Sequence, residues 1–349
     1  MYERIAEIAS RIAASEEVER RAAEMIRGKD EEIFPDALER KLSRKVGVNE
    51  VDGQVGAVDG GLLAQEFHGI DLVITRAVAV VFEYEKSKRK AHRYYPSAIV
   101  TPDVEADEYL ETHEFLWYKS LLRLREELST ARGAIEKFKP DFMLMDGSVV
   151  PQITDKPGEG SPIRGLYNEF IGEYKKLYKS ADLDNCSLVG VIKDSTGKRF
   201  VDIMRSYLGS EGGILGKAHD TGFLNFLLKE GERTFTFRYS SSQKEHQVLK
   251  DLEDWGAKVD AFYLKAVEGD RPLRVEFIEG KRSFDEIASL IFTLSRINKN
   301  YAYPAVLIEA DLRAALDQAE LDTVYGELVA KTGLRSSMMK LRRDSRPFR

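Results

Sequence analysis

The sequence predicts an α/β fold in which a mixed central sheet is flanked by helices. A strand-like apolar run ends at Asp59 and is followed at once by two glycines. A second run of the same kind ends at Asp146 and is followed by one glycine. Long amphipathic segments separate the strand candidates. Glycine after a strand allows a ligand or metal to approach the backbone closely, so the two aspartates are expected to converge on one point.

The bulk composition predicts a cytoplasmic protein with no membrane partner. The chain has 349 residues and 43% hydrophobic content, enough for a substantial core. No apolar run approaches the ~20 residues of a membrane span, and the N-terminus lacks a signal-peptide pattern. The single cysteine, Cys186, excludes an internal disulfide and a cysteine-rich zinc site. The net charge of −6 restricts any nucleic-acid site to a local basic channel.

The first 48 residues are expected to form an N-terminal helical arm. Residues 1–28 predict one helix, because Ile5, Ile8 and Ile12 recur at helical spacing and charges cover the other faces. A second, short helix is expected over 35–45. Two roles stay open for the apolar face of the first helix: packing on its own domain, and contact with a partner or a second copy.

Three strand candidates follow, at 54–58, 71–84 and 88–95. The second is rich in β-forming residues, and the third is expected to pair with it as a hairpin through 85–87. A sheet that opens with antiparallel strands, the first ending in an acid, resembles the ribonuclease H-like arrangement.

A long helix is expected from about 107 to 138, where Pro140 ends it. At ~100° per residue, Glu127 lies at the edge of the apolar face around Leu128, whereas Glu126 points almost opposite. Glu126 is therefore expected to be solvated. For Glu127 two alternatives stay open, a solvated position and one aimed at the sheet.

The next strands are expected at 141–146 and 187–192, separated by a Gly- and Pro-rich loop at 151–164 and an amphipathic helix at 166–179. Lys193 directly follows the second of these strands. Beside a metal site, this lysine would hold a phosphate or steady an attacking water. The alternative is an ordinary surface lysine.

The second half alternates between helix and strand. We expect helices at 200–208, 220–228, 243–255 and 283–297, and strands at 234–239, 261–267 and 274–277. Ser283 with a glutamate three residues later forms the sequence pattern of a capping box. Arg274 and Glu276 point to the same side of their strand, and we interpret them first as a structural ion pair.

The last expected helix runs over 305–319, and Pro304 is well placed at its start. Asp311 shares a face with Ile308, Leu312 and Ala315. Because burying an unpaired carboxylate is costly, Asp311 is expected to have a cation, a metal or a helix cap as its partner.

The main domain is expected to span 49–330, followed by a basic tail at 331–349. The tail contains seven Lys or Arg residues and one Asp. Its composition predicts a flexible arm that suits nucleic acid or an acidic partner surface, with a plain solvated terminus as the alternative.

The acidic residues predict a metal site. Asp59, Glu127, Asp146 and Asp311 together carry more charge than a site holds without cations. Two divalent ions ~4 Å apart would neutralise them and suit an in-line displacement at phosphorus. Oxygen ligands favour Mn²⁺ or Mg²⁺ over zinc, and the five histidines show no metal-ligand spacing. The sequence contains no P-loop and no Gly-x-Ser-x-Gly motif.

Five short motifs, in this order over about residues 50–320, resemble the NurA nuclease family. They are Val-Asp-Gly-Gly at 58–61, Leu-Met-Asp-Gly-Ser at 144–148, Val-Ile-Lys-Asp-Ser at 191–195, Arg-Val-Glu-Phe at 274–277 and Tyr-Pro-Ala-Val-Leu-Ile-Glu-Ala-Asp at 303–311. The resemblance implies a ribonuclease H-like core and Mn²⁺ dependence. It also implies 5′–3′ exonuclease activity on DNA, often with single-strand endonuclease activity.

The same resemblance implies partners and site residues. Members of the family form ring-like homodimers that dock on the hexameric HerA translocase for DNA-end resection and double-strand break repair. By resemblance, Asp59 and Asp146 carry the metal-binding core and Glu127 is the helical ligand. In the family the last motif commonly ends in an Ala-His pair, whereas this chain has Ala310-Asp311. Aspartate is also a hard metal ligand, so the change is expected to alter metal preference without abolishing activity.

Two other functions were weighed against the nuclease. A non-catalytic, dimeric DNA-binding and docking partner of the translocase is the main alternative, and the presence of all four acids favours the enzyme over it. An actin-like ATPase also has Asp-Gly-Gly after its first strand, but it needs a second phosphate loop that the sequence lacks.

Overall fold

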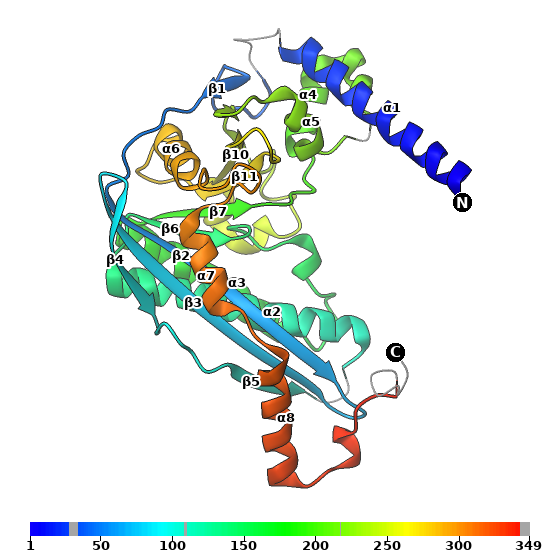
Figure 1. The fold of residues 1–349 in the computed structure, drawn as a ribbon, viewed down its shortest axis with the longest axis vertical. Coiled ribbons are helices and arrows are strands. Elements are labelled where there is room, and N and C mark those ends of the chain that lie inside the picture. Colours follow the sequence, from blue (N-terminus) through cyan, green and yellow to red (C-terminus); the bar gives the residue numbers. More distant parts are fainter. Residues whose placement is uncertain (28–33, 108–109, 217, 343–349) are drawn as a thin grey trace.

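The computed structural model describes residues 1–27, 34–107, 110–216 and 218–342. A mixed sheet runs through the centre, and helices cover both of its faces (Figure 1). This arrangement confirms the predicted α/β class. Within the described ranges, we find no helix with the length and hydrophobicity that a membrane span requires.

In the described residues the sheet has 11 strands. Their bounds are Ser43–Lys45 (β1), Gly53–Glu66 (β2), Asp71–Glu85 (β3), Lys88–Tyr95 (β4), Asp103–Asp107 (β5), Phe142–Asp146 (β6), Ser187–Ile192 (β7), Glu232–Thr234 (β8), Phe237–Arg238 (β9), Val259–Lys265 (β10) and Leu273–Ile278 (β11). They are ordered β1-β8-β10-β11-β7-β6-β2-β3-β4, while β5 pairs with β3 and β9 with β10. The pairs β2–β6 and β6–β7 are parallel. The antiparallel β2, β3 and β4 beside the parallel β6 and β7 form the arrangement that the sequence predicted.

Strand β2 is longer than the expected 54–58. It continues past Gly60 and Gly61 to Glu66 and stays paired with β3 along its whole length. The two glycines therefore lie inside a strand, where they leave room for neighbouring elements. Asp59 accordingly lies in the middle of β2 and not at its end.

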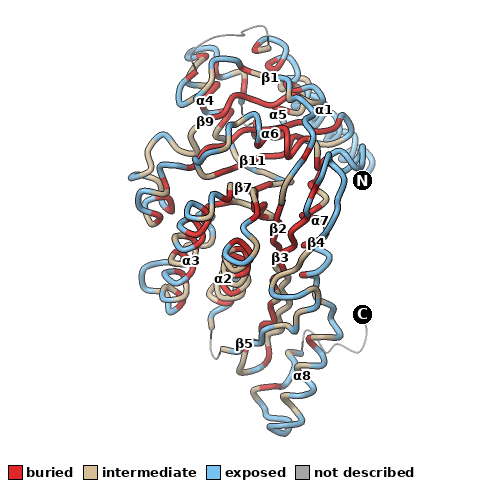
Figure 2. The backbone as a smooth tube through the Cα atoms, turned by 90° about the vertical axis from the view of Figure 1, so that its left-hand side faces the viewer, coloured by how far each residue is buried: buried red, intermediate tan, exposed pale blue. Residues whose placement is uncertain are grey.

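Two groups of helices cover the two faces of the sheet. The α-helices are Tyr2–Arg27 (α1), Thr112–Phe138 (α2), Arg164–Leu183 (α3), Arg199–Leu208 (α4), Asp220–Leu227 (α5), Phe284–Leu294 (α6), Ala305–Ala314 (α7) and Gln318–Thr332 (α8). One apolar cluster joins α2 and α3 to one face, and another joins α6 and α7 to the opposite face. Figure 2 shows the buried residues concentrated along the sheet and on the inner sides of these helices. The capping box predicted at Ser283 is present at the start of α6.

Helix α1 confirms the predicted N-terminal helix, but most of its apolar face is exposed. Only its last part packs on the protein, through Ala22, Ala23 and Ile26, in a cluster with α4 and α5. Ile5, Ile8 and Ile12 are 54%, 42% and 56% exposed. The rest of the helix projects from the body of the molecule (Figure 1).

Several expected elements differ from the structure. The segment 35–45 is not a helix, because it pairs with other strands through Ala37 and through β1. The start of the expected helix at 107 is instead β5, which pairs with β3. The segment 243–255 contains a 3₁₀ helix, Leu249–Lys258 (η3), interrupted at Glu253, where φ is +54°. Two further 3₁₀ helices, Ile153–Asp155 (η1) and Gly209–Leu215 (η2), lie in loops.

The expected helix at 305–319 is two helices. Helix α7 ends at Ala314, and Asp317 begins α8 as its N-cap by accepting a hydrogen bond from the Ala319 amide. A side chain that caps a new helix favours a break before it.

The first part of the basic tail is packed and does not extend freely as expected. Residues Ser336–Met338 form a 3₁₀ helix (η4), and Met338 is only 4% exposed. Phe67 pairs with Lys340, and the Tyr325 hydroxyl donates to the Met338 carbonyl over 3.1 Å. The rest of the tail, 343–349, lies outside the described residues.

We predict that Gly61→Ala destabilises the fold. A Cβ atom at Gly61 would lie 2.1 Å from the Ala314 carbonyl oxygen, so α7 would have to move away from β2. Such overpacking typically costs about 1–3 kcal/mol of the free energy of unfolding, which urea denaturation measures. Gly158→Ala is the control, since a Cβ there meets nothing within 4 Å. Equal stability of the two variants would contradict the packing of α7 on Gly61.

Candidate metal centre

Three carboxylates meet at one point of the sheet. Each of Asp59, Asp146 and Asp311 offers an oxygen, and these oxygens all lie within 4.8 Å of one another. Val58 pairs with Met145 in the parallel ladder between β2 and β6, so the residues that follow them, Asp59 and Asp146, lie side by side. Asp311 comes from α7, about 250 residues away from Asp59 in the sequence.

The position of α7 explains how Asp311 reaches the other two acids. The buried side of the helix carries Val306, Leu307, Ala310 and Ala314, which pack against the sheet. Asp311 itself is exposed, and Leu312 is 65% exposed. The expectation that Asp311 lies in a buried apolar stripe was therefore wrong. A cation, a metal or a helix cap as its partner stays a prediction.

Asp59 has a strongly raised pKa. Its side chain is 8% exposed. Burial, followed by the nearby Asp146 carboxylate, raises the pKa of Asp59 to about 7, although the Gly60 amide donates a hydrogen bond to it over 2.7 Å. Neither Asp59 nor Asp311 forms an ion pair with a Lys or Arg in the described parts of the chain. These two members of the cluster therefore lack a positive charge that would neutralise them.

Glu127 approaches the cluster from α2. It is buried, and burial raises the pKa of Glu127 to about 8, while Arg123 partly opposes the effect through an ion pair of 3.1 Å. Gly60 makes this approach possible, because a Cβ there would lie 3.3 Å from Glu127 Oε2. Of the two alternatives left open, the structure favours the one aimed at the sheet.

Glu126 is not solvated as expected. Its Oε1 accepts a hydrogen bond from the Ala77 amide of β3 over 3.3 Å, and its Oε2 is buried without a hydrogen bond from the described residues. Burial raises the pKa of Glu126. The prediction failed because Ala77 of β3 contacts α2 at Glu126, outside the apolar face that the sequence indicates.

Lys193 and Tyr303 both contact Asp146. Lys193 Nζ lies 3.0 Å from Asp146 Oδ2, and the Tyr303 hydroxyl donates to Asp146 Oδ1 over 2.6 Å. The Lys193 ammonium also lies 4.1 Å from the centre of the Tyr303 ring. Burial lowers the pKa of Lys193, but Asp146 more than offsets this, so the net shift is upward. Tyr303 was not predicted as a site residue, although it begins the motif at 303–311.

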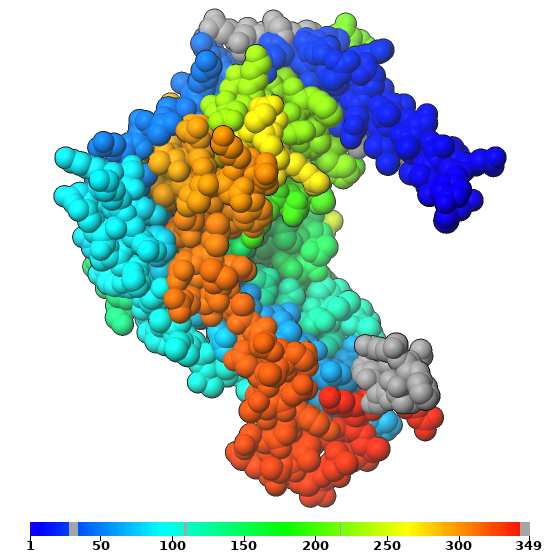
Figure 3. All heavy atoms as spheres, in the orientation of Figure 1, coloured from blue at the N-terminus to red at the C-terminus, as the bar shows by residue number. Residues whose placement is uncertain are grey.

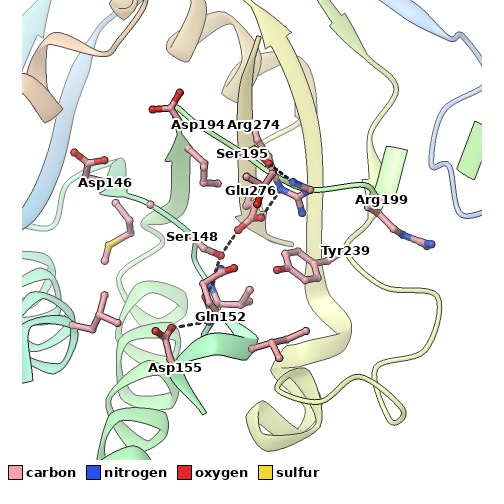
Figure 4. Close-up of a pocket in the computed structure, with 18 of the residues that line it drawn as sticks. Asp146, Ser148, Gln152, Asp155, Asp194, Ser195, Arg199, Tyr239, Arg274 and Glu276 are labelled. Atoms are coloured by element: carbon pink, nitrogen blue, oxygen red, sulfur yellow. Dashed lines mark hydrogen bonds and ion pairs between the residues drawn. The ribbon is translucent and has the colours of Figure 1, made fainter. Parts of the chain in front are cut away.

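A cavity of 730 Å³ opens beside the cluster, and Glu127 and Asp146 form part of its wall. Figure 4 shows Asp146 at one side and Ser148, Glu276 and Arg274 at another. Arg274 Nε donates to Glu276 Oε1 over 2.6 Å, which confirms the predicted ion pair, and the Ser148 hydroxyl donates to Glu276 Oε2. This buried pair fixes the wall of the cavity.

The residues present fit a hard divalent cation. The cluster offers carboxylate oxygens only, which Mg²⁺ and Mn²⁺ accept. No histidine or cysteine of the described chain joins it. A buried acid with a raised pKa and no cationic partner gains most from such an ion, because the metal supplies the missing charge.

Comparison with known proteins identifies the family. The NurA domain model matches residues 53–316. The crystal structure of the NurA nuclease from Sulfolobus solfataricus is similar over 95% of this chain and 96% of that chain, with a TM-score of 0.58 and 16% identity. A crystal structure of NurA with manganese is similar over 96% of this chain and 100% of that chain, with a TM-score of 0.54 and 12% identity.

These structural similarities show a shared fold, and no curated protein matches the sequence. The domain match extends over far more than half of the chain and contains Asp59, Glu127, Asp146, Lys193 and Asp311. The protein therefore belongs to the NurA family of nucleases.

Proposed function

We propose that the protein is a divalent-metal-dependent nuclease that hydrolyses phosphodiester bonds in DNA. The observation that carries this proposal is the convergence of Asp59, Asp146 and Asp311 on one point, where no Lys or Arg of the described residues pairs with Asp59 or Asp311. The presence of every acid that the chemistry needs favours an enzyme over a non-catalytic docking protein.

Each side chain has a role in the proposed reaction. Asp59, Asp146 and Asp311 would hold the divalent ions, of which we propose two, through their carboxylate oxygens. Glu127 would complete the second site after losing its proton. When bound, Mn²⁺ or Mg²⁺ would lower the pKa of a water and neutralise the charge that develops on the phosphate. Lys193 would donate to the scissile or adjacent phosphate, and Tyr303 would hold the Asp146 carboxylate in position.

The cavity beside the cluster supports an exonuclease, for which we propose the 5′–3′ direction, with single-strand endonuclease activity as a further proposal. A space of 730 Å³ is in the range of small-ligand sites and accommodates a nucleotide at the end of a strand. Polarity itself comes to this proposal from the family.

We propose further that the protein acts in the cytoplasm as a homodimer with a HerA-type hexameric translocase, in DNA-end resection and double-strand break repair. Family membership and the exposed face of α1 support the partners. Ile5, Ile8 and Ile12 are half exposed on a projecting helix, and a lone helix of this kind gains stability from a partner surface.

We predict that Asp59→Asn abolishes DNA cleavage and leaves the fold intact. The change removes the central ligand and keeps the side-chain size. Purified protein is assayed on end-labelled single- and double-stranded DNA with Mn²⁺, Mg²⁺ or EDTA, and circular dichroism checks folding. Asp182→Asn, an exposed residue of α3, is the matched control. Cleavage by Asp59→Asn at the wild-type rate would remove this residue from the site.

We predict that stability in EDTA falls as the pH rises. The folded-state pKa values of Asp59 and Glu127, about 7 and about 8, lie above the ordinary values of 3.8 and 4.5. The stabilisation is therefore complete below pH 4 and is lost as the pH rises through 7 to 8, by on the order of 2–4 kcal/mol. Thermal melts should show the largest gain from Mn²⁺ at pH 8. A gain that is independent of pH would place the metal elsewhere.

We predict that Ile8→Asp converts a dimer to a monomer, because it puts a charge in the apolar face of α1. Sedimentation velocity measures the change in mass. Ser10→Asp is the control, since Ser10 lies ~200° around the helix from Ile8. If both variants stay dimeric, α1 is not the dimer contact.

A further inference from the structure

The hairpin formed by β3 and β4 concentrates cations at one edge of the sheet. Residues 83–93 contain five Lys or Arg residues and two Glu, in a chain whose net charge is −6. Residues 85–92 are exposed. Glu85 pairs with Lys90 over 2.7 Å, while Lys86 and Lys88 form no ion pair with the described residues. We call residues 85–93 the cationic hairpin.

The cationic hairpin is aligned with the metal centre. Asp59 lies opposite Val78, and Val80 and Phe82 lie opposite Tyr94 and His92. Opposite residues share a face and alternate residues point the same way, so Tyr94 and His92 lie on the Asp59 face. Strands are spaced about 4.8 Å apart, which places the end of β4 about 10 Å from Asp59. Strand β4 then extends about 24 Å further toward its tip.

Helix α7 connects the two regions. Its Glu309 accepts a hydrogen bond from the Tyr94 hydroxyl over 2.6 Å, and the Arg313 guanidinium lies 5.0 Å from the Tyr94 ring centre. The same helix carries Asp311. Figure 3 shows the hairpin and α7 side by side on one face of the molecule. Arg313 pairs with Glu309 over 2.9 Å. One surface therefore continues from the carboxylate cluster, across α7, to the hairpin, and its excess positive charge lies in the hairpin.

We propose that the cationic hairpin binds the sugar–phosphate backbone of the DNA substrate beyond the bond that is cut. The inference rests on the proposed nuclease function for the position of that bond. Phosphates along one strand of a duplex rise about 3.4 Å per step, which is close to the rise per residue of β4. A stretch of about seven base pairs spans the strand.

The simplest competing explanation is protection of an exposed sheet edge. Strand β4 is the last strand in the order of the sheet, and lysines on such an edge prevent aggregation. One or two charges suffice for that purpose. The hairpin carries five Lys or Arg residues, more than this purpose requires. This excess of positive charge favours a polyanion as the ligand.

The test removes two charges and measures the salt dependence of DNA binding. Lys88→Gln with Lys90→Gln is compared with the parent protein, both in the Asp59→Asn background and with a fluorescent 20-base-pair duplex. Two lost phosphate contacts should lower the slope of log Kd against log[salt] by about 1.8, and weaken binding at 0.1 M salt roughly tenfold or more. The matched control is Lys179→Gln with Lys244→Gln, because both lysines are exposed and lie outside the hairpin. These changes should leave the slope unchanged.

Duplex length provides a second measurement. The parent should gain affinity as the duplex is lengthened from 6 to 14 base pairs, and the hairpin variant should not. An unchanged slope together with an unchanged length dependence overturns the proposal. A variant that aggregates but binds DNA like the parent also overturns it, and shows that the lysines protect the edge.

Different results would contradict DNA binding by the hairpin and the proposed nuclease function. Hydrolysis of bis(p-nitrophenyl) phosphate with Mn²⁺, by protein that keeps Asp59, reports the metal centre without a long DNA. The protein could hydrolyse this compound and DNA while the hairpin variant keeps the salt slope of the parent. That result would refute DNA binding by the hairpin and support the nuclease function. Alternatively, DNA binding could depend on the hairpin while neither substrate is hydrolysed. That result would support DNA binding by the hairpin and refute the nuclease function.

Discussion

The parallel pairing of β2 with β6 is the constraint on which the site depends. Its register places Asp59 beside Asp146, and a shift of one residue would send one of the two carboxylates to the opposite face. Burial, followed by the nearby Asp146 carboxylate, raises the pKa of Asp59, so its ionised form is costly in the folded protein. The apolar residues of β2 and β6 on both faces hold the register despite this repulsion. The fold thus holds two carboxylates close together despite their repulsion, and a bound divalent cation would stabilise this arrangement.

Helix α7 adds the third acid in a position that local helix rules disfavour. Asp311 lies in the last turn of α7, where the helix dipole is unfavourable for a negative side chain. The helix is nevertheless held there from two sides. Gly61 lets its C-terminal end touch β2, and Tyr303, just before its start, is tied to Asp146. A residue that breaks a local rule while its supports are well packed is typical of a functional position.

The sequence predicted most of the sheet and the main acids, for reasons that can be traced. Apolar runs ending in Asp59 and Asp146 indicated two strands whose aspartates converge. Helical geometry placed Glu127 at the edge of the apolar face of its helix. The predictions that failed have a common cause, because the features concerned depend on contacts with residues that are distant in the sequence. The continuation of β2 beyond Gly61 depends on pairing with β3, and the burial of Glu126 depends on Ala77. Tyr303 carries no local signal of its contact with Asp146. Asp311 was selected through a buried face that it does not have.

The distribution of charge resolves an apparent conflict between a net charge of −6 and a polyanionic substrate. At physiological salt the Debye length is about 8 Å, so a phosphate responds to charges in its neighbourhood and not to the total. The carboxylate cluster repels phosphate until metal ions neutralise it. Strand β4 ends about 10 Å away, and the cationic hairpin begins two residues further along it, beyond one screening length. Its charges would therefore attract a DNA backbone without weakening the cluster's affinity for metal. In the proposed function, metal and DNA would therefore bind to separate parts of one surface, and each part keeps the charge that its own ligand requires.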